Sequence, residues 1–282
     1  MTVPPLPGHV VEDAVRRALA EDSAGAGDIT SLATISADAE GRYEIRARKA
    51  GVICGLQPAR EALRQCDPDI SFEARVDDGA IVEAGQAVAR IAGRVRPVLT
   101  AERIALNFLG RMSGVATLTA AYAQRIAGTG AVVTHTRKTT PGLRAFEIQA
   151  VRAGGGAAHR FSLSDAVLIK DNHVAAAGGV GEAVRRAKAY AGHMTRVATE
   201  IDSLSQLEDA LEAGADSILL DNFSLDELRA AVAQTRGRAT LEASGGVTFD
   251  TIRAIAETGV DVISVGALTH SAPNFDLGLD AL

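Results

Sequence analysis

Residues 134–174 read THTRKTTPGLRAFEIQAVRAGGGAAHRFSLSDAVLIKDNHV and show one pattern at both ends. The β-branched run VVTHT at 132–136 stops at Arg137-Lys138, and the apolar run VLI at 167–169 stops at Lys170. Short runs of this kind indicate buried strands. Because α/β proteins place their chemistry where parallel strands end, the stretch predicts two such strands with a site at their carboxyl ends.

The connection between these strands predicts a short helix. Thr139 to Gly142 break the chain, and the apolar residues of 143–153 then recur close to helical spacing. Gly154-Gly155-Gly156 end the helix. Regular alternation of strand and helix is the mark of an α/β protein.

Positive charge is concentrated in this stretch. It has three acidic residues against six basic ones, a local net charge of +3 in a chain whose total is −6. Cations gathered around glycines indicate a site for a small, multiply charged anion. The acidic remainder argues against a nucleic-acid partner. The six basic residues are Arg137, Lys138, Arg144, Arg152, Arg160 and Lys170.

Length and composition set wider bounds. A chain of 282 residues with 47% hydrophobic residues predicts two domains with real cores. Aromatic residues make up only 4% of the chain, which argues against a site that stacks on nucleobases. The two cysteines fit neither a disulfide framework nor a zinc site. The N-terminus lacks the pattern of a signal peptide, and no uninterrupted apolar window reaches the length of a membrane span. We therefore expect a soluble, cytoplasmic protein without a membrane partner.

The first hundred residues predict a small α+β domain. An amphipathic helix is expected at 9–21, strands dominate 39–93, and one helix interrupts them at 58–65. Thr100 is then the expected N-cap of a long helix. Arg103 would lie in the first turn of that helix, where the helix dipole disfavours a cation by roughly 0.3–1 kcal/mol. A solvated Arg103 is the simpler interpretation, and an Arg103 that faces an anion is the alternative.

The last hundred residues predict repeated βα units. Strands are expected at 196–201, 217–222, 240–244 and 262–266, with helices at 204–213, 225–235 and 249–258. LEDALEAGADSILLDN and IRAIAETGVDVISVG echo each other, which places Asp216 and Asp261 at equivalent points. Together with the two strands of the opening stretch, the pattern predicts a six-stranded α/β barrel, short of the usual eight strands.

The ends of the six predicted strands gather polar residues and glycines. Two glycine-containing turns, Ser244-Gly245-Gly246 with Thr248 opening a helix and Val265-Gly266-Ala267, predict a phosphate-binding cup. His159 is the histidine best placed for a role. The strand-end positions are Arg137, Lys138, Lys170, Glu200, Asp221, Ser244 and Gly266.

Two interpretations remain open for Glu200 and Asp221. They form ion pairs with Lys138 and Lys170, or they bind a Mg²⁺ ion that bridges to a polyphosphate, and both can hold in turn.

At these residues the chain resembles the quinolinate phosphoribosyltransferase family. The matching phrases run in order through nearly the whole chain, and TRKTTPGLR with LIKDNH is a highly specific pair. The other phrases are ALAEDSAGAGDITS, ERIALNFLGRMSGVAT, AVRAGGG followed by HR, the strand ends at Glu200 and Asp221, EASGGV and VGALTHS.

The resemblance implies a fold and a reaction. The fold is an N-terminal open α/β sandwich (1–113, joined by the tail at about 272–282) and a six-stranded, incomplete TIM-like α/β barrel (114–271). The reaction transfers phosphoribosyl from 5-phosphoribosyl 1-pyrophosphate to quinolinate with loss of CO₂, giving nicotinate mononucleotide in NAD biosynthesis. The protein would be a homodimer that uses Mg²⁺.

The resemblance also implies site residues. Lys138, Lys170, Glu200 and Asp221 would be catalytic, with Glu200 and Asp221 on the metal, and Arg103 would reach across the dimer interface, against the simpler interpretation above. Quinolinate contacts would come from Arg137, Lys138, His159, Arg160 and Lys170, and Thr136 would also bind substrate. Contacts to the phosphoribosyl donor would come from Lys138, Ser244, Gly245, Gly246, Val265, Gly266, Ala267 and His270.

The chain departs from the family pattern at four positions. His135 replaces the usual Asp, Ile148 a Lys, Ala158 an Asn and Ser162 a Gly. These changes leave room for a paralogue of this fold found with molybdate-transport genes. A barrel lyase that uses Lys170 or Lys138 as a Schiff-base nucleophile and a non-catalytic binding protein are the further alternatives.

Overall fold

The computed structural model describes residues 3–282 and divides into two compact units. Of the described residues, the first comprises 3–120, 139–155 and 271–282, and the second comprises 121–138 and 156–270. The chain therefore passes from one unit to the other more than once. The boundary expected between residues 113 and 114 falls inside helix α4 (Val95–Arg125), whose last residues belong to the second unit.

The first unit is built on an antiparallel sheet in the order β12-β1-β5-β3. The C-terminal strand β12 pairs with β1, with Ile45 opposite Leu279, so the tail returns to this unit as the resemblance implied. A small second sheet pairs β2 with β4. The strands are β1 (Glu40–Ala47), β2 (Gly51–Val52), β3 (Ser71–Ala74), β4 (Ile81–Val82), β5 (Ala87–Arg94) and β12 (Leu277–Ala281).

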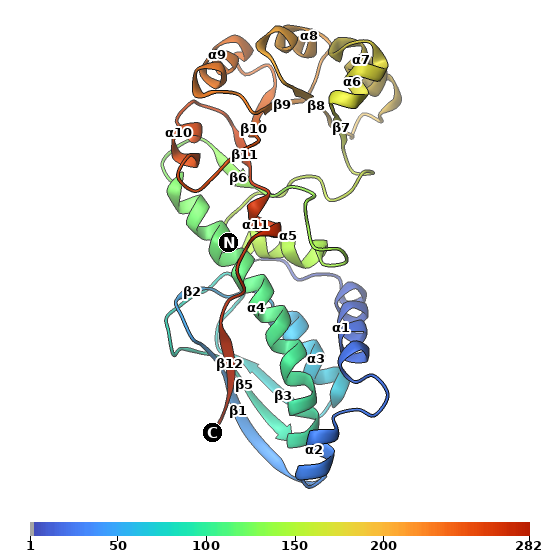
Figure 1. The fold of residues 1–282 in the computed structure, drawn as a ribbon, viewed down its shortest axis with the longest axis vertical. Helices are drawn as coiled ribbons and strands as arrows, with labels where there is room; N and C mark the ends of the chain where they lie inside the picture. Colours follow the sequence, from blue (N-terminus) through green and yellow to red (C-terminus); the bar gives the residue numbers. More distant parts are fainter. Residues whose placement is uncertain (1–2) are drawn as a thin grey trace. The chain divides into compact units, whose positions relative to one another are not determined.

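Helices α1, α3 and α4 gather on one side of this sheet (Figure 1). Leu63, Leu109 and Met112 are fully buried among them. Helix α5 packs closely on α4, since a Cβ on Gly154 would lie 2.3 Å from the carbonyl oxygen of Ala116. The remaining helices of this unit are α1 (Gly8–Asp22), α2 (Ile29–Thr34), α3 (Leu56–Cys66) and α5 (Arg144–Ala153).

The prediction that Thr100 caps the long helix is wrong. Helix α4 begins at Val95, and the Thr100 hydroxyl donates to the carbonyl oxygen of Arg96 inside the helix. Pro97 is tolerated because it lies in the first turn, where its missing N–H would have no helical partner. Arg103 is therefore the ninth residue of the helix, and the predicted cost from the helix dipole does not apply.

The second unit contains the predicted parallel sheet, with strand order β6-β11-β10-β9-β8-β7. All six predicted strands are confirmed, although several are shorter than expected. Strands β6 and β7 lie at the two edges of the sheet. The strands are β6 (Val132–Thr134), β7 (Val167–Ile169), β8 (Val197–Ile201), β9 (Ser217–Asp221), β10 (Thr240–Ser244) and β11 (Val262–Ser264).

Helices α6 to α10 line one face of this sheet (Figure 1). Val184, Leu207, Leu228 and Ile252 bury the apolar faces of four of them. Helices α6 and α7 were not predicted, and α10 starts three residues later than expected. The helices are α6 (Asp171–Ala177), α7 (Val180–Tyr190), a 3₁₀ turn (Leu204–Gln206), α8 (Leu207–Glu212), α9 (Leu225–Thr235), α10 (Ile252–Ala256) and α11 (Ala267–His270).

The two similar segments of the sequence share one hydrogen-bond arrangement, which Asp261 makes in one and Asp216 in the other. Asp261 binds both backbone groups of Leu241. Its Oδ2 accepts the Leu241 N–H at 2.8 Å, and its own N–H donates to the Leu241 carbonyl at 3.0 Å. Asp216 binds Val197 in the same way, at 2.6 and 2.8 Å. The Asp261 carbonyl also accepts the N–H of Val132 at the start of β6. Each aspartate thus fixes the register of neighbouring parallel strands.

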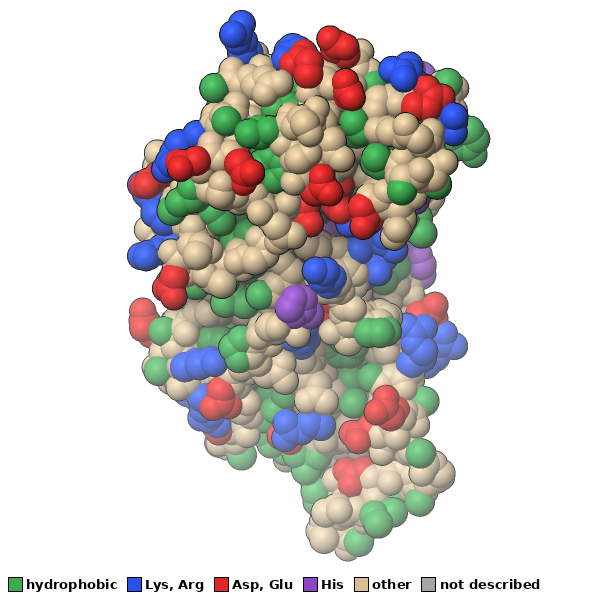
Figure 2. Space-filling model, turned by 45° about the horizontal axis from the view of Figure 1, so that its top comes forward, with side chains coloured by type: hydrophobic (Ala, Val, Ile, Leu, Met, Phe, Trp, Pro, Cys, Tyr) green, Lys and Arg blue, Asp and Glu red, His purple; other side chains and the backbone are tan. Residues whose placement is uncertain are grey.

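The outer surface carries charges of both signs. Acidic and basic side chains are interspersed over the face shown in Figure 2, and several form pairs one helical turn apart, such as Arg186 with Glu182 at 2.8 Å. Among the helices of residues 3–282, none has the length and hydropathy needed to cross a bilayer.

The hydrogen-bond arrangement of Asp261 makes a prediction about stability. Asp261→Ala leaves the N–H of Leu241, a residue only 3% exposed, without its acceptor. An unmade buried hydrogen bond costs about 1–3 kcal/mol, so the free energy of unfolding should fall by that amount. Asp261→Asn keeps an acceptor and should lose clearly less. Urea denaturation followed by circular dichroism measures both, and equal losses in the two variants would contradict this role for Asp261.

Candidate functional site

A cavity of about 620 Å³ opens in the second unit where the parallel strands end. Residues from all six strands or the turns that follow them line it, and His159 and Arg160 join them from the segment between α5 and β7. The lining is Thr136, Arg137, Lys138, His159, Arg160, Leu168, Lys170, Glu200, Leu219, Asp221, Asn222, Glu242, Ser244, Gly245, Gly246 and Ser264. Eleven of the predicted site residues are in this list.

The turn after β6 presents Arg137 and Lys138. The backbone N–H of Lys138 donates to the Thr136 hydroxyl at 3.1 Å, and its carbonyl accepts from the Thr269 hydroxyl at 2.8 Å. Both ends of the Lys138 peptide unit are therefore held while its side chain remains exposed.

The segment that carries His159 and Arg160 is attached to the edge of β6. The Ala157 N–H donates to the Val133 carbonyl at 2.8 Å, and the His159 N–H donates to Nε2 of His135 at 3.0 Å. His135 is completely buried, and its Nδ1 lies 3.1 Å from the Thr136 carbonyl. Since Nε2 accepts, Nδ1 carries the proton. His135, noted above as a departure from the family pattern, thus holds the backbone of His159 in place.

Two guanidinium groups are close neighbours in the cavity. Burial and the nearby Arg137 lower the pKa of Arg160, and Asp165 opposes that shift. Nη1 of Arg160 donates to the Ala166 carbonyl at 3.2 Å, which fixes the direction of the side chain. Like charges held together in a partly buried site are stabilised by an anionic ligand between them.

The cavity also carries carboxylates. Nζ of Lys170 lies 2.6 Å from Oε2 of Glu200, so the ion-pair interpretation is confirmed for this pair. His173 orients Lys170 by accepting its backbone N–H at Nδ1, 3.1 Å away. Burial and the charge of Glu200 raise the pKa of Asp221, while Lys170 and Lys138 oppose the rise. In residues 3–282 no three acidic, histidine or cysteine side chains cluster as a metal site.

The turn after β10 needs its glycines. Gly245 has φ +89° and Gly246 φ +60°, and a Cβ on Gly245 would lie 2.2 Å from Oδ1 of Asn222. Asn222 itself has φ +58° and donates from Nδ2 to Asp221 at 2.8 Å. Gly245 and Asn222 therefore fit together as a unit beside Asp221.

The second predicted phosphate turn is only partly suited to its role. The Val265 N–H donates to the Thr134 carbonyl at 2.9 Å, and the Val265 side chain is buried, so this N–H is not available to a phosphate. Gly266 brings the chain close to two other predicted residues, because its Cβ would lie 3.0 Å from Nε2 of His270 and 3.4 Å from Cδ of Lys138. Ala267 and His270 form the single turn of α11.

Thr248 does not open a helix as predicted. It forms a turn in which its N–H donates to the Thr251 hydroxyl, and α10 starts only at Ile252.

The other predicted cations lie elsewhere. Arg144 and Arg152 belong to helix α5 in the first unit and do not line the cavity, so two of the six basic residues were wrongly grouped with the site. Arg103 is exposed on α4, also in the first unit.

Sequence reasoning missed Glu242 and Asn222. Glu242 is 6% exposed, and its Oε2 lies 3.6 Å from Nε2 of His159. An acidic residue inside the apolar strand TLEAS was the signal for it. Asn222 follows Asp221 directly, and its left-handed backbone could be found only in the structure.

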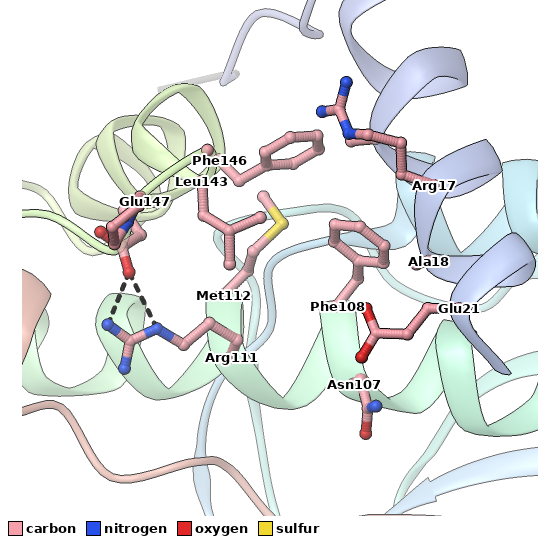
Figure 3. A pocket seen from close by; sticks show the side chains of 13 residues that line it. Arg17, Ala18, Glu21, Asn107, Phe108, Arg111, Met112, Leu143, Phe146 and Glu147 are labelled. Atoms are coloured by element: carbon pink, nitrogen blue, oxygen red, sulfur yellow. Dashed lines mark hydrogen bonds and ion pairs between the residues drawn. The ribbon is translucent and has the colours of Figure 1, made fainter.

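A second cavity, of about 350 Å³, lies in the first unit (Figure 3). Phe108, Met112, Leu143 and Phe146 give it a largely apolar wall (Figure 3). At one end Arg111 donates from Nη2 to the fully buried Glu147 at 2.6 Å. None of the predicted substrate-binding residues lines it.

Known proteins match the chain over nearly its full length. A family model described as the N-terminal domain of quinolinate phosphoribosyl transferase matches residues 28–113, and the model of the C-terminal domain matches 115–280. The chain is 43% identical to the nicotinate-nucleotide pyrophosphorylase [carboxylating] of Mycobacterium leprae (strain TN) over 273 residues, 95% of this chain and 96% of that protein. It is 39% identical to a probable enzyme of the same name from Bacillus subtilis (strain 168), over 91% of this chain and 88% of that protein.

A solved structure agrees with these relatives. The nicotinate-nucleotide pyrophosphorylase of Francisella tularensis superposes with a TM-score of 0.95 at 39% identity, covering 100% of this chain and 99% of that one. The chain belongs to the quinolinate phosphoribosyltransferase family.

Proposed function

We propose that the protein transfers the phosphoribosyl group of 5-phosphoribosyl 1-pyrophosphate to quinolinate and releases pyrophosphate and CO₂, giving nicotinate mononucleotide for NAD biosynthesis. It is a pentosyltransferase, as its relatives are by name. The observation that carries the proposal is the single cavity that joins a cationic side to two carboxylates and a glycine turn.

The cationic side suits a diacid. Quinolinate has two adjacent carboxylates on a pyridine ring, and a guanidinium fork can take a carboxylate through two parallel hydrogen bonds. Arg137, Arg160 and Lys170 supply the charge. Burial and repulsion from Arg137 lower the pKa of Arg160, and binding the diacid would relieve that repulsion. His159 and Thr136 complete this side.

The glycine side suits the phosphoribosyl donor. The open backbone of Ser244, Gly245 and Gly246 can approach a phosphate closely, and Lys138 adds a positive charge. Gly266, Ala267 and His270 would extend this surface. Positive charge at this point favours the transition state, because negative charge develops on pyrophosphate as it leaves the ribose.

Glu200 and Asp221 fit a Mg²⁺ ion. Burial and the charge of Glu200 raise the pKa of Asp221, so a cation between the two carboxylates would relieve their repulsion. Magnesium commonly takes one or two carboxylates and completes its shell with phosphate oxygens and water. When bound, it would neutralise charge on the leaving pyrophosphate. Lys170 pairs with Glu200 in its absence.

Two further features belong to the proposal. The six-stranded sheet would curve into an incomplete barrel, with residues 1–113 and the tail as the accompanying domain. The protein would act as a homodimer in which Arg103 reaches the diacid in the partner's cavity, and the exposure of Arg103 on α4 supports this role.

The Schiff-base alternative finds less support. A covalent lysine mechanism needs a free amine, whereas Lys170 is engaged through its ammonium group with Glu200 at 2.6 Å. Lys138 lies between the carboxylate and glycine sides, which suits a phosphate contact.

The substrate prediction is direct. Purified protein mixed with quinolinate, 5-phosphoribosyl 1-pyrophosphate and Mg²⁺ should form nicotinate mononucleotide and CO₂. Chromatography measures the mononucleotide, and trapping measures the CO₂. Nicotinate has one carboxylate fewer and leaves part of the cationic side unpaired, so its kcat/KM should be lower by at least about a hundredfold. Equal use of both acids would contradict the diacid site.

The cationic residues make a second prediction. Arg137→Ala and Lys170→Ala should each reduce kcat/KM for quinolinate by about a thousandfold or more, with unchanged circular dichroism. Arg152→Ala is the matched control, since Arg152 comes from the same basic stretch but lies outside the cavity, and it should keep full activity. Wild-type turnover by Arg137→Ala or Lys170→Ala would remove that residue from the site.

The glycine turn makes a third prediction. Gly245→Ala strains a backbone with φ +89° and drives a Cβ into Asn222, so kcat/KM for the phosphoribosyl donor should fall about a hundredfold. Gly237→Ala is the control, because Gly237 also has positive φ (+74°) but has open space around its Cβ and lies at the other end of β10. Steady-state kinetics separate the two. Equal losses in Gly245→Ala and Gly237→Ala would mean that backbone strain alone causes the effect, and would contradict a role for the close fit of Gly245 against Asn222.

A further inference from the structure

Glu242 is a buried acid in the cavity lining, which it shares with Glu200, Asp221 and four basic residues. It faces the same side of β10 as Ser244, two residues on, and lies between Leu219 of β9 and Val262 of β11 in the sheet register. Its side chain is 8% exposed, and Oε1 has no hydrogen-bond partner among the described residues. A buried carboxylate oxygen without a partner costs free energy, so the site must give Glu242 a use that offsets this cost.

His159 is its neighbour in the cavity. Nε2 of His159 lies 3.6 Å from Oε2 of Glu242, and Nδ1 of His159 is buried without a hydrogen-bond partner among the described residues. The backbone of His159 is fixed by His135, so the ring has a defined place beside the acid. The two side chains are therefore neighbours, an imidazole beside a carboxylate, and Arg137, Arg160 and Lys170 line the same cavity.

The proposed reaction consumes a proton. When CO₂ leaves the pyridine ring, the bond between the ring carbon and the carboxylate breaks and its electron pair stays on that carbon. The positively charged ring nitrogen next to it stabilises the pair. A proton must then bond to this carbon to give nicotinate mononucleotide, and a positioned acid accelerates such a step by about 10²–10⁴-fold.

We propose that His159 donates this proton and that Glu242 acts as its positioning residue, balancing the charge of the protonated imidazole. The inference rests on the proposed function and adds the proton source to it. The proton passes from His159 to the ring carbon, the imidazole becomes neutral, and it regains a proton from water after the product leaves.

The other protonatable groups of the cavity have different partners. Lys170 is paired with Glu200, and Asp221 accepts from Asn222. Lys138 lies next to Gly266 and His270, on the side proposed for the phosphoribosyl donor. The pair of Glu242 and His159 lies instead next to Arg160, on the side proposed for the diacid, where the carboxylate departs.

The test separates the two chemical steps. Quinolinate labelled with ¹⁴C in the carboxylate next to the ring nitrogen and 5-phosphoribosyl 1-pyrophosphate labelled in its pyrophosphate are mixed with enzyme and Mg²⁺ in a rapid-quench apparatus. Wild-type enzyme should release pyrophosphate and CO₂ in equal amounts. In Glu242→Gln, CO₂ release should lag behind pyrophosphate release by about a hundredfold, since an unprotonated ring carbon recaptures CO₂. The carboxylated mononucleotide should then accumulate.

Further variants exclude a merely structural role. Glu242→Asp keeps an acid and should restore much of the CO₂ release. Glu257→Gln changes an acid that pairs with Arg253 outside the cavity lining, and it should keep the two products equal. His159→Gln should repeat the lag, and it carries the test if Glu242→Gln does not fold. Equal release of both products in the Glu242 and His159 variants would overturn the proposal. Absence of pyrophosphate release by wild-type enzyme would instead overturn the proposed function.

Discussion

The register of the six parallel strands is the constraint on which the cavity depends. A strand shifted by one residue would turn its side chains to the other face, and the charged groups at its end would leave the cavity. Asp216 and Asp261 oppose such a shift, because each binds both backbone groups of the first residues of a neighbouring strand. The starts of the strands, far from the chemistry, thus decide which residues meet at their ends.

The cavity then brings together charges that repel one another. Burial together with the charge of Arg137 lowers the pKa of Arg160, and burial together with the charge of Glu200 raises the pKa of Asp221. Charges placed in this way before a ligand arrives need little rearrangement when it binds, which is how preorganised sites favour a reaction. A diacid relieves the first repulsion and a cation relieves the second, so the two binding sites become complementary to their ligands for the same physical reason.

The sequence predicted the parallel sheet and most of the cavity lining because both depend on local patterns. Short apolar runs that end in Lys170 or Asp221 are visible without a structure, as are the glycines at 245 and 246. Arg144 and Arg152 were wrongly grouped with the site because closeness in sequence was taken for closeness in space, whereas the chain passes into the other unit at residue 139. That passage depends on the packing of α5 against α4, which no local pattern records.

Other features of the structure were not predicted from the sequence, for different reasons. The start of α4 was misplaced because Thr100 resembles a cap and Pro97 resembles a break, although proline is accepted in a first turn. Glu242 was overlooked because alternation along a strand does not say which face turns to a polar cavity. The role of His135 depends on a hydrogen bond to a residue 24 positions away, and only the folded chain shows that bond.

The central claim is that one cavity holds the diacid next to the phosphoribosyl donor. A crystal structure with 5-phosphoribosyl 1-pyrophosphate, Mg²⁺ and benzene-1,2-dicarboxylate, which has no ring nitrogen to attack the sugar, tests it most directly. We expect the diacid between Arg137, Arg160 and Lys170 and the donor against Gly245 and Gly246, within contact of each other. Ligands bound at separate places, or a diacid outside this cavity, would contradict it.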